Sequence, residues 1–293
     1  MSTLVLECLQ WGADSAEKID WLDAPPASAW NAALELLEQL GCVSGKKITA
    51  LGVAALGMGI HPRLACAAIA GSVHAALEYG QYASAPPAVQ EKFSADLKKR
   101  LSKIPPYLRS SLSLEFSVLA GFPDRIAQRT DDENYCFPSG RIARLPKDCS
   151  PPFPKWIVAP VVDAGEREGK IRSFLPLDDT DAENWINARA KKSVRMELKD
   201  GKVRKLEVTA YGKIVLAEKK LPADAEDFVR ALCAEVSSRG LSVLPLDERT
   251  KMLILRRAFY EEQCAIPDTE KKSVRSALAK SVSDWLVPFL GGK

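Results

Sequence analysis

A phosphate-binding loop is the first chemistry to test in this 293-residue sequence, because one segment comes close to it. Gly41 and Gly45 precede Lys46, which is the order in which a P-loop presents its glycines and its lysine to a nucleotide. Three residues separate the two glycines where the loop requires four, and Lys47 stands where a Ser or Thr hydroxyl would bind Mg²⁺. The sequence also has no Asp-Glu-x-His box, and the segment 131–134 is interpreted as a surface turn. We therefore predict no nucleotide site in this chain.

Residues that could hold a metal or act as a nucleophile are scattered. His61 and His74, the two histidines, lie 13 residues apart without acidic or cysteine neighbours at metal-ligand spacing. The seven cysteines include no C-x-x-C pair, so reduced and mostly buried thiols are expected rather than a zinc site or a disulfide frame. No G-x-S-x-G nucleophile motif occurs. We therefore predict neither a catalytic residue nor a metal or other cofactor in this chain.

Three aspartates, at positions 178, 179 and 181, form a further group that could do chemistry. They precede a short helix predicted at 183–186, and acidic side chains at a helix N-terminus accept its unpaired N–H groups and favour its dipole. Helix capping therefore explains them better than catalysis does.

The basic residues point to binding rather than to catalysis. Between Arg189 and Lys220 the chain has eleven Lys or Arg and four Asp or Glu, although its overall net charge is only +3. Such a concentration suits a polyanion, and a solvated basic face is the plain alternative. Two groups are candidates for contacts with nucleic-acid phosphates. One lies on a helix predicted at 89–104 and the other lies on or beside predicted strands: Lys98, Lys99, Arg100 and Lys103; and Arg125, Arg129, Lys191, Lys192, Arg195, Arg204 and Lys205.

The second group is preferred because the predicted local structure brings its members together. Arg195 and Arg204 lie on strands that the Asp200–Gly201 turn would join, so they can share one face of a hairpin. Arg125 and Arg129 are four residues apart and would project together if their segment is helical. The first group surrounds the apolar stripe of its helix on nearly all sides, as ordinary solvation requires.

The elements before these groups are predicted to be mainly helical. Apolar residues repeat at three and four over 27–40, two short strands surround Ser44–Gly45, and Thr49 can cap a helix over 50–58. This helix, wing, helix order is typical of a winged-helix domain, predicted for residues 1–60. That range has seven Asp or Glu and three Lys or Arg, whereas a winged helix that grips DNA is normally basic. It is therefore interpreted as a packing module.

The remaining elements predict an α+β fold with three further parts. Helices at 62–79, 89–104 and 107–120 indicate a helical bundle over 61–120. A hairpin at 135–145 and strands at 156–162, 170–175 and 193–198, followed by a return strand through Leu206 and Val208 and a third strand from Ile214, indicate a small antiparallel barrel or sandwich over 121–221. Residues 222–293 are predicted to form a helical segment, with helices at 223–239, 247–262 and 271–290.

Several stretches carry a more specific resemblance. They keep one order along the chain: KITALG at 47–52, HPRLA at 61–65, FPDRIA at 122–127, WIVA at 156–159, RKLEVTAYGKIVLAEKKL at 204–221 and DWLVPFL at 284–290. These segments, in this order, resemble the region that follows the motor in bacterial HrpB-type ATP-dependent helicases of the DEAH/RHA class. The resemblance is thin between residues 65 and 113, where the prediction rests on pattern.

The resemblance implies a role. The bundle would be a ratchet-like domain, the barrel OB-like, and the chain an accessory region that guides single-stranded RNA or DNA. Both RecA-like motor domains, with their ATP and Mg²⁺, would precede Met1 in the same polypeptide and be partners of this region, which should be inactive alone. A cytoplasmic protein without a membrane partner is expected, because no window approaches about 20 apolar residues and acidic Glu7 stands near the start.

Two other classes of function stay open. A sequence-specific winged-helix DNA-binding regulator with a sensor domain would use the same helix, wing, helix order. A protein-interaction scaffold would bind no oligonucleotide even at low salt.

Overall fold

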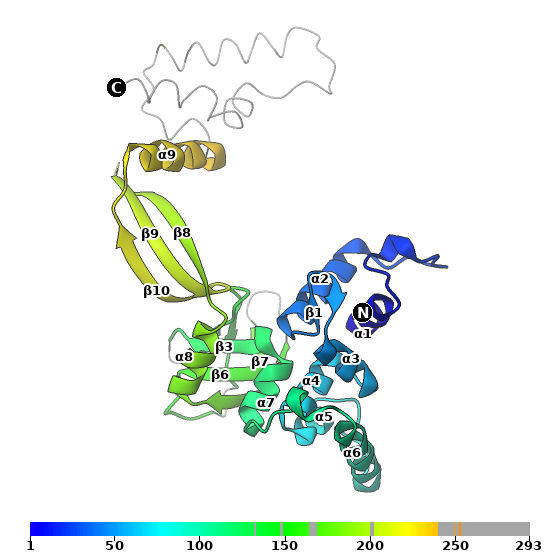
Figure 1. Cartoon of the computed structure of the whole chain (residues 1–293). Helices are drawn as coiled ribbons and strands as arrows, with labels where there is room; N and C mark the ends of the chain where they lie inside the picture. Colours follow the sequence, from blue (N-terminus) through cyan, green and yellow to red (C-terminus); the bar gives the residue numbers. More distant parts are fainter. Residues whose placement is uncertain are drawn as a thin grey trace. The chain divides into compact units, whose positions relative to one another are not determined.

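A computed structural model of the chain describes residues 1–131, 133–146, 149–163, 169–199 and 202–239, together with Arg249 and Met252. These residues form an α+β fold that divides into two units (Figure 1). The first unit comprises 1–190 and 211–214, and the second comprises 191–210 and the chain from 215 onward. The predicted turn at Asp200–Gly201, the predicted helix at 271–290 and the DWLVPFL stretch lie outside the described residues, and so does the predicted helix at 247–262 apart from Arg249 and Met252.

Three α-helices, one 3₁₀ helix and a two-stranded ribbon begin the first unit. In order they are α1 (Ser2–Gln10), the 3₁₀ helix η1 (Ala16–Lys18), α2 (Ala27–Gln39), β1 (Val43–Ser44), β2 (Lys47–Ile48) and α3 (Ala50–Gly57). The two strands pair antiparallel, as predicted. The Thr49 hydroxyl accepts the N–H of Gly52 and so caps α3, as the sequence also predicted. Leu6, Leu37 and Met58 are fully buried in the core that these helices share.

Four further helices follow: α4 (Pro62–Ala70), α5 (Val73–Glu78), α6 (Pro87–Ser102) and α7 (Leu114–Gly121). The single helix predicted at 62–79 is wrong, because Gly71 has a φ of 145° and Ser72 begins α5 by accepting the N–H of Ala75. Among the described residues, no single helix is long and apolar enough to cross a membrane. Together α3 and α4 reach that length, but a bend of 103° separates them.

The helix predicted at 107–120 forms only in its second half. The 3₁₀ helix η2 (Pro106–Leu108) is followed by a non-helical stretch, and α7 begins at Leu114. Within that stretch the N–H groups of Ser110 and Leu112 donate to the carbonyls of Ile69 and Ala70 at the end of α4. Unpaired carbonyls at a helix C-terminus need such donors, and a continuous helix over 107–120 could not supply them.

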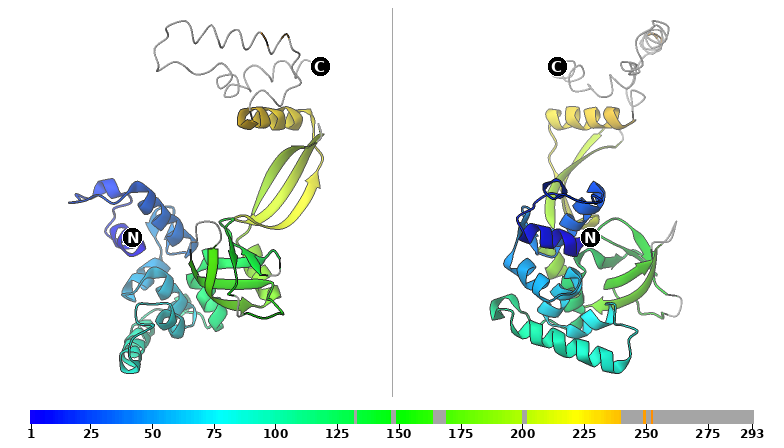
Figure 2. Two further views of the ribbon diagram at one scale, coloured as in Figure 1. Left: turned by 180° about the vertical axis from the view of Figure 1, so that it is seen from behind. Right: turned by 90° about the vertical axis from the view of Figure 1, so that its right-hand side faces the viewer.

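After these helices, the first unit contains a closed five-stranded barrel (Figure 2). After the 3₁₀ helix η3 (Pro123–Arg125), its strands are β3 (Ile126–Arg129), β4 (Asn134–Cys136), β5 (Ile142–Arg144), β6 (Trp156–Asp163) and β7 (Gly169–Leu177). They are ordered β3-β4-β5-β7-β6. Because β5 and β7 are parallel, the prediction of a wholly antiparallel barrel is wrong at this pair. Tyr135, Ile157 and Ile171 fill its interior. In α8 (Asp179–Asn187), Asp178 accepts two N–H groups of the first turn, which confirms the capping role. The helix begins four residues before the predicted 183–186, so Asp179 and Asp181 lie within its first turn instead of preceding it.

The second unit contains a separate sheet and a helix. The strands β8 (Lys191–Lys199), β9 (Lys202–Tyr211) and β10 (Ile214–Leu221) are ordered β10-β9-β8, and α9 (Ala225–Arg239) follows them. The sequence placed these strands in one domain with the barrel. The structure instead closes the barrel with β3 to β7 alone, because β3 is paired on both sides, with β4 and with β6.

The turn between β9 and β10 belongs to the first unit. The N–H of Lys213 donates to the carbonyl of Pro138 over 2.8 Å, and the Tyr211 hydroxyl donates to the carbonyl of Pro123 over 3.2 Å. The Tyr211 ring also meets the Trp185 ring edge to face, with centroids 5.6 Å apart. These contacts fix the turn to the barrel and to α8.

Two glycines of α3 provide a matched pair of substitutions that tests how closely this helix packs against Cys42. A Cβ at Gly52 would lie 2.2 Å from the carbonyl oxygen of Cys42, whereas a Cβ at Gly57 would meet nothing within 4 Å. We expect Gly52→Ala to destabilise the protein by about 1–3 kcal/mol through overpacking and Gly57→Ala to stabilise it by about 0.5–1 kcal/mol through helix propensity. Urea unfolding followed by circular dichroism measures both. Equal effects of the two substitutions would contradict the close approach of α3 to Cys42.

Candidate nucleic-acid interface

The hairpin of β8 and β9 places two of the predicted arginines together. Arg195 lies opposite Leu206, and Glu197 lies opposite Arg204. Opposed residues of an antiparallel pair share a face, so Arg195 and Arg204 are diagonal neighbours on one face, as the sequence predicted. Both side chains are exposed. This face therefore presents two cations at the spacing of neighbouring strands.

Leu206 and Val208 are buried on the face that carries Arg195. In the sequence, Val194 and Met196 alternate with Arg195 and Glu197, and this alternation by itself predicts that the other side of β8 is the apolar one. In the observed register that other side contains Lys192, opposite Thr209, and it leaves Val194 half exposed. Apolar side chains therefore lie on both faces of the hairpin.

Lys205 lies on the face opposite to Arg204 and has a structural partner. It is paired with Met196 in the strand register, and its Nζ donates to Oδ2 of Asp227 in α9 over 2.7 Å. The Asp227 side chain is only 5% exposed, and the N–H of Asp224 also donates to it. These hydrogen bonds, that from Lys205 first, lower the pKa of Asp227. Lys205 therefore joins α9 to the sheet.

Arg125 and Arg129 do not project from one helix. Arg125 ends η3 and pairs with Asp124 over 3.4 Å, while Arg129 ends β3 and donates to the carbonyl of Phe153 over 2.6 Å. The helical interpretation of this segment is wrong, because Ile126 already pairs with Val158 in the barrel. The two side chains therefore project from different elements, Arg125 from a 3₁₀ helix and Arg129 from a β-strand.

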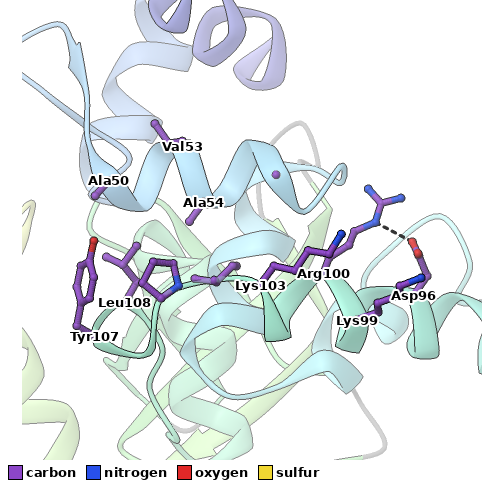
Figure 3. Close-up of a pocket in the computed structure, with 12 residues that line it drawn as sticks. Ala50, Val53, Ala54, Asp96, Lys99, Arg100, Lys103, Tyr107 and Leu108 are labelled. Atoms are coloured by element: carbon purple, nitrogen blue, oxygen red, sulfur yellow. Dashed lines mark hydrogen bonds and ion pairs between the residues drawn. The ribbon is translucent and has the colours of Figure 1, made fainter.

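The cations of α6 have different surroundings. Arg100 donates from Nε to Asp96 over 2.7 Å and from Nη1 to the carbonyl of Met58 over 3.3 Å, so it ties α6 to the end of α3. Lys98, Lys99 and Lys103 are exposed. Lys99 and Lys103 line a cavity beside α3, and Lys98 does not (Figure 3).

Two further arginines were not singled out from the sequence. Arg63 donates to both carboxylate oxygens of Asp124, over 2.6 and 2.9 Å, and lies 5.2 Å from the centre of the Phe122 ring. Arg189 lies 4.1 Å from the centre of the Trp185 ring, and its burial lowers the pKa of its guanidinium. Arg63 is held by a residue that is distant in the sequence, and Arg189 lies against an aromatic ring. A count of charged residues along the sequence detects neither contact.

The histidines and thiols have local structural surroundings. His61 caps α4, with Nδ1 accepting the N–H of Arg63, and burial lowers its pKa. His74 is exposed beside Glu78. The buried thiols of Cys42 and Cys66 lie 3.5 Å apart, and their hydrogen bond lowers the pKa of Cys42 and raises that of Cys66. Among the described residues, no group of three or more His, Cys, Asp or Glu side chains is arranged to hold a metal ion.

The different roles of Lys205 and its neighbours can be tested by stability. Lys205→Met removes the cation that faces the Asp227 carboxylate, so we expect a lower melting temperature at neutral pH. A carboxyl whose folded pKa is lowered stabilises the fold above its ordinary pKa of about 3.9 and loses this effect as the pH falls through the folded value. The difference from the unchanged protein should therefore shrink on acidification below about pH 4.

Lys192→Met is the matched control for this experiment, because Lys192 is exposed on the same face. It should leave the melting temperature unchanged at both pH values. An equal loss in the two variants, or a loss at Lys205 that does not depend on pH, would contradict the assigned pair.

Comparisons with known proteins extend over the whole chain. No protein-family model matches it. The ATP-dependent RNA helicase HrpB of Escherichia coli K12 is 28% identical, and the alignment covers 100% of this chain and 39% of the relative. The chain thus spans about two fifths of that protein's length.

Two solved structures have a similar fold. They are crystal structures of E. coli HrpB, described as a DExH-box NTPase and as a DEAH/RHA helicase. Each is 23% identical over 99% of this chain, with TM-scores of 0.63 and 0.64, and this chain covers 39% and 40% of them. The chain is therefore similar along its whole length to a part of the HrpB-type ATP-dependent helicases, which confirms the resemblance that its sequence landmarks indicated.

Proposed function

We propose that this chain is the accessory, nucleic-acid-guiding region of an ATP-dependent RNA helicase of the HrpB type. Its ligand is single-stranded RNA or DNA, and its partners are RecA-like motor domains that precede it in the same polypeptide. Two facts support this proposal: the aligned relative is named an ATP-dependent RNA helicase, and the sequence has neither a P-loop nor an Asp-Glu-x-His box. ATP and Mg²⁺ would bind to the motor.

The finer architecture is part of the same proposal. The order α2, β1, β2, α3 supports a winged helix at the start, and α4 to α7 support a ratchet-like bundle after it. The barrel order β3-β4-β5-β7-β6, with β5 and β7 parallel, supports an OB-like Greek-key barrel. OB-like barrels commonly bind single strands across their second and third strands, which here are β4 and β5.

The observation that carries the proposal best is the pair of exposed arginines on one face of the β8–β9 hairpin. Diagonal neighbours on a strand pair lie about 7–8 Å apart, so a single strand that crosses the hairpin can place successive phosphates beside both guanidinium groups. Such contacts read no base edges and release counterions from the strand. The binding should therefore be weak, independent of sequence and strongly dependent on salt.

We expect the double substitution Arg195→Gln and Arg204→Gln to weaken binding of labelled oligouridine and to flatten its salt dependence. Removing one cation that neutralises a phosphate of a single strand lowers the slope of log K against log salt by about 0.7, so the two substitutions together remove roughly 1.4. Fluorescence anisotropy at two or more salt concentrations measures the slope. Oligonucleotides of other base composition should be affected alike.

Lys219→Gln with Lys220→Gln is the matched control, because it also removes two exposed cations from the second unit. It should change the slope less than the arginine pair does. An unchanged affinity in the folded arginine variant, or an equal loss in the control, would contradict the assigned face. No oligonucleotide binding at low salt would favour an interaction scaffold instead.

A further inference from the structure

A groove in the first unit runs along one side of α3. Its volume is about 730 Å³. One wall is α3 itself, and the other is the C-terminal end of α6 with the segment that follows it (Figure 3). All the residues that line it lie in the first unit, so its shape is set within one body.

The α3 wall is a continuous apolar stripe. Ala50, Val53, Ala54 and Gly57 follow one another at intervals of three, one and three residues, which places them on one side of the helix. Val53 is 46% exposed, although the opposite side of α3 packs into the core through Ala55. Small side chains at these positions allow the backbone of another helix to come close.

The α6 wall adds positive charge and one aromatic ring. Lys99 and Lys103 lie one helical turn apart, and in the part of the chain that the structure describes neither makes an ion pair. Arg100 is already held by Asp96, as the dashed line in Figure 3 shows. Tyr107, which is 79% exposed, lines the other end of the groove near Ala50.

We propose that this groove binds a short amphipathic helix of a partner protein whose polar edge is acidic. The apolar side chains of that helix would lie on the α3 stripe, and its carboxylates would pair with Lys99 and Lys103. Helices bind to apolar grooves in this way through side chains at i, i+3, i+4 and i+7. The eight residues of α3 span about 12 Å, which matches about two to three turns of the bound helix.

The same features disfavour a nucleic-acid strand as the occupant. Sites for single strands combine cations with several aromatic rings on which successive bases stack. Here the floor is aliphatic, and Tyr107 is the one aromatic side chain among the residues that line the groove. The charge complementarity is therefore that of an acidic peptide with an apolar face.

The test begins with selection of displayed peptides on the complete 293-residue chain. A library of helical peptides with about 11 variable residues, or three turns, is enriched on the unchanged protein and counter-selected on Val53→Asp, which places a carboxylate on the apolar wall. We expect enriched sequences to have apolar residues at helical spacing and an excess of Asp and Glu. No enrichment over the counter-selected variant, or enriched sequences without acidic residues, would overturn the proposal.

Charge reversal then tests the contact with a synthesised peptide from the selection. We expect Lys103→Glu to weaken its binding at least about tenfold, and a version of the peptide with Lys in place of its acidic residues to bind this variant better than it binds the unchanged protein. Val89→Asp, on an exposed valine of α6 that does not line the groove, should leave peptide affinity unchanged. Equal losses in Val53→Asp and Val89→Asp would overturn the assigned location.

Oligouridine binding separates this proposal from the proposed function. Val53→Asp should leave the affinity for oligouridine and its salt slope unchanged, because the groove is not on the hairpin. A clear loss of oligouridine binding in a folded Val53→Asp variant, with circular dichroism as the check on folding, would make the groove part of the nucleic-acid path and overturn the peptide proposal.

Discussion

The Arg63–Asp124 pair is the interaction on which the arrangement of the first unit depends. Arg63 lies in α4 and Asp124 lies in the 3₁₀ turn that leads into the barrel, so their two parallel hydrogen bonds connect the helices to the first barrel strand. The same guanidinium donates to the carbonyl of Gly121 at the end of α7 and lies over the Phe122 ring. Because the Arg63 side chain is only 15% exposed, loss of Asp124 would leave its cation without a carboxylate partner in a poorly solvated place. The barrel and the bundle are thus held at a fixed junction rather than joined by a flexible linker.

Local signals in the sequence predicted much of the fold correctly. The cap at Thr49 identified where α3 begins, the role of Asp178 as a cap was recognised although its helix was predicted to start four residues too late, and alternation with turn residues identified the hairpin of β4 and β5. The break between α4 and α5 at Gly71 was missed although its signals are local, whereas another error arose where a distant part of the chain decides the local structure. The stretch before α7 has helical periodicity, but Ser110 and Leu112 are held by carbonyls of α4, about 40 residues earlier. Periodicity alone could not reveal those acceptors.

In the candidate nucleic-acid interface too, local sequence signals predict some features, and other features depend on contacts with distant parts of the chain. The shared face of Arg195 and Arg204 follows from strand alternation and a short turn, so the sequence was enough to predict it. Lys205 is adjacent to Arg204 in the sequence and has the same charge, yet its partner is Asp227 in α9. Counting charges cannot separate a cation that is used internally from one that is exposed. The groove beside α3 was not predicted, because it exists only where the end of α6 lies against that helix.

Because the turn at Tyr211–Ile214 belongs to the first unit, each of the two units is built from segments that are not continuous in the sequence. Since this turn is held by the barrel while the strands on either side of it belong to the second unit, the polypeptide passes between the units at three places, after residues 190, 210 and 214. Recombination that joins a foreign segment at one boundary would therefore divide a unit rather than exchange it. The sheet of β8 to β10 therefore cannot be exchanged as one continuous segment without also exchanging the turn that the barrel holds.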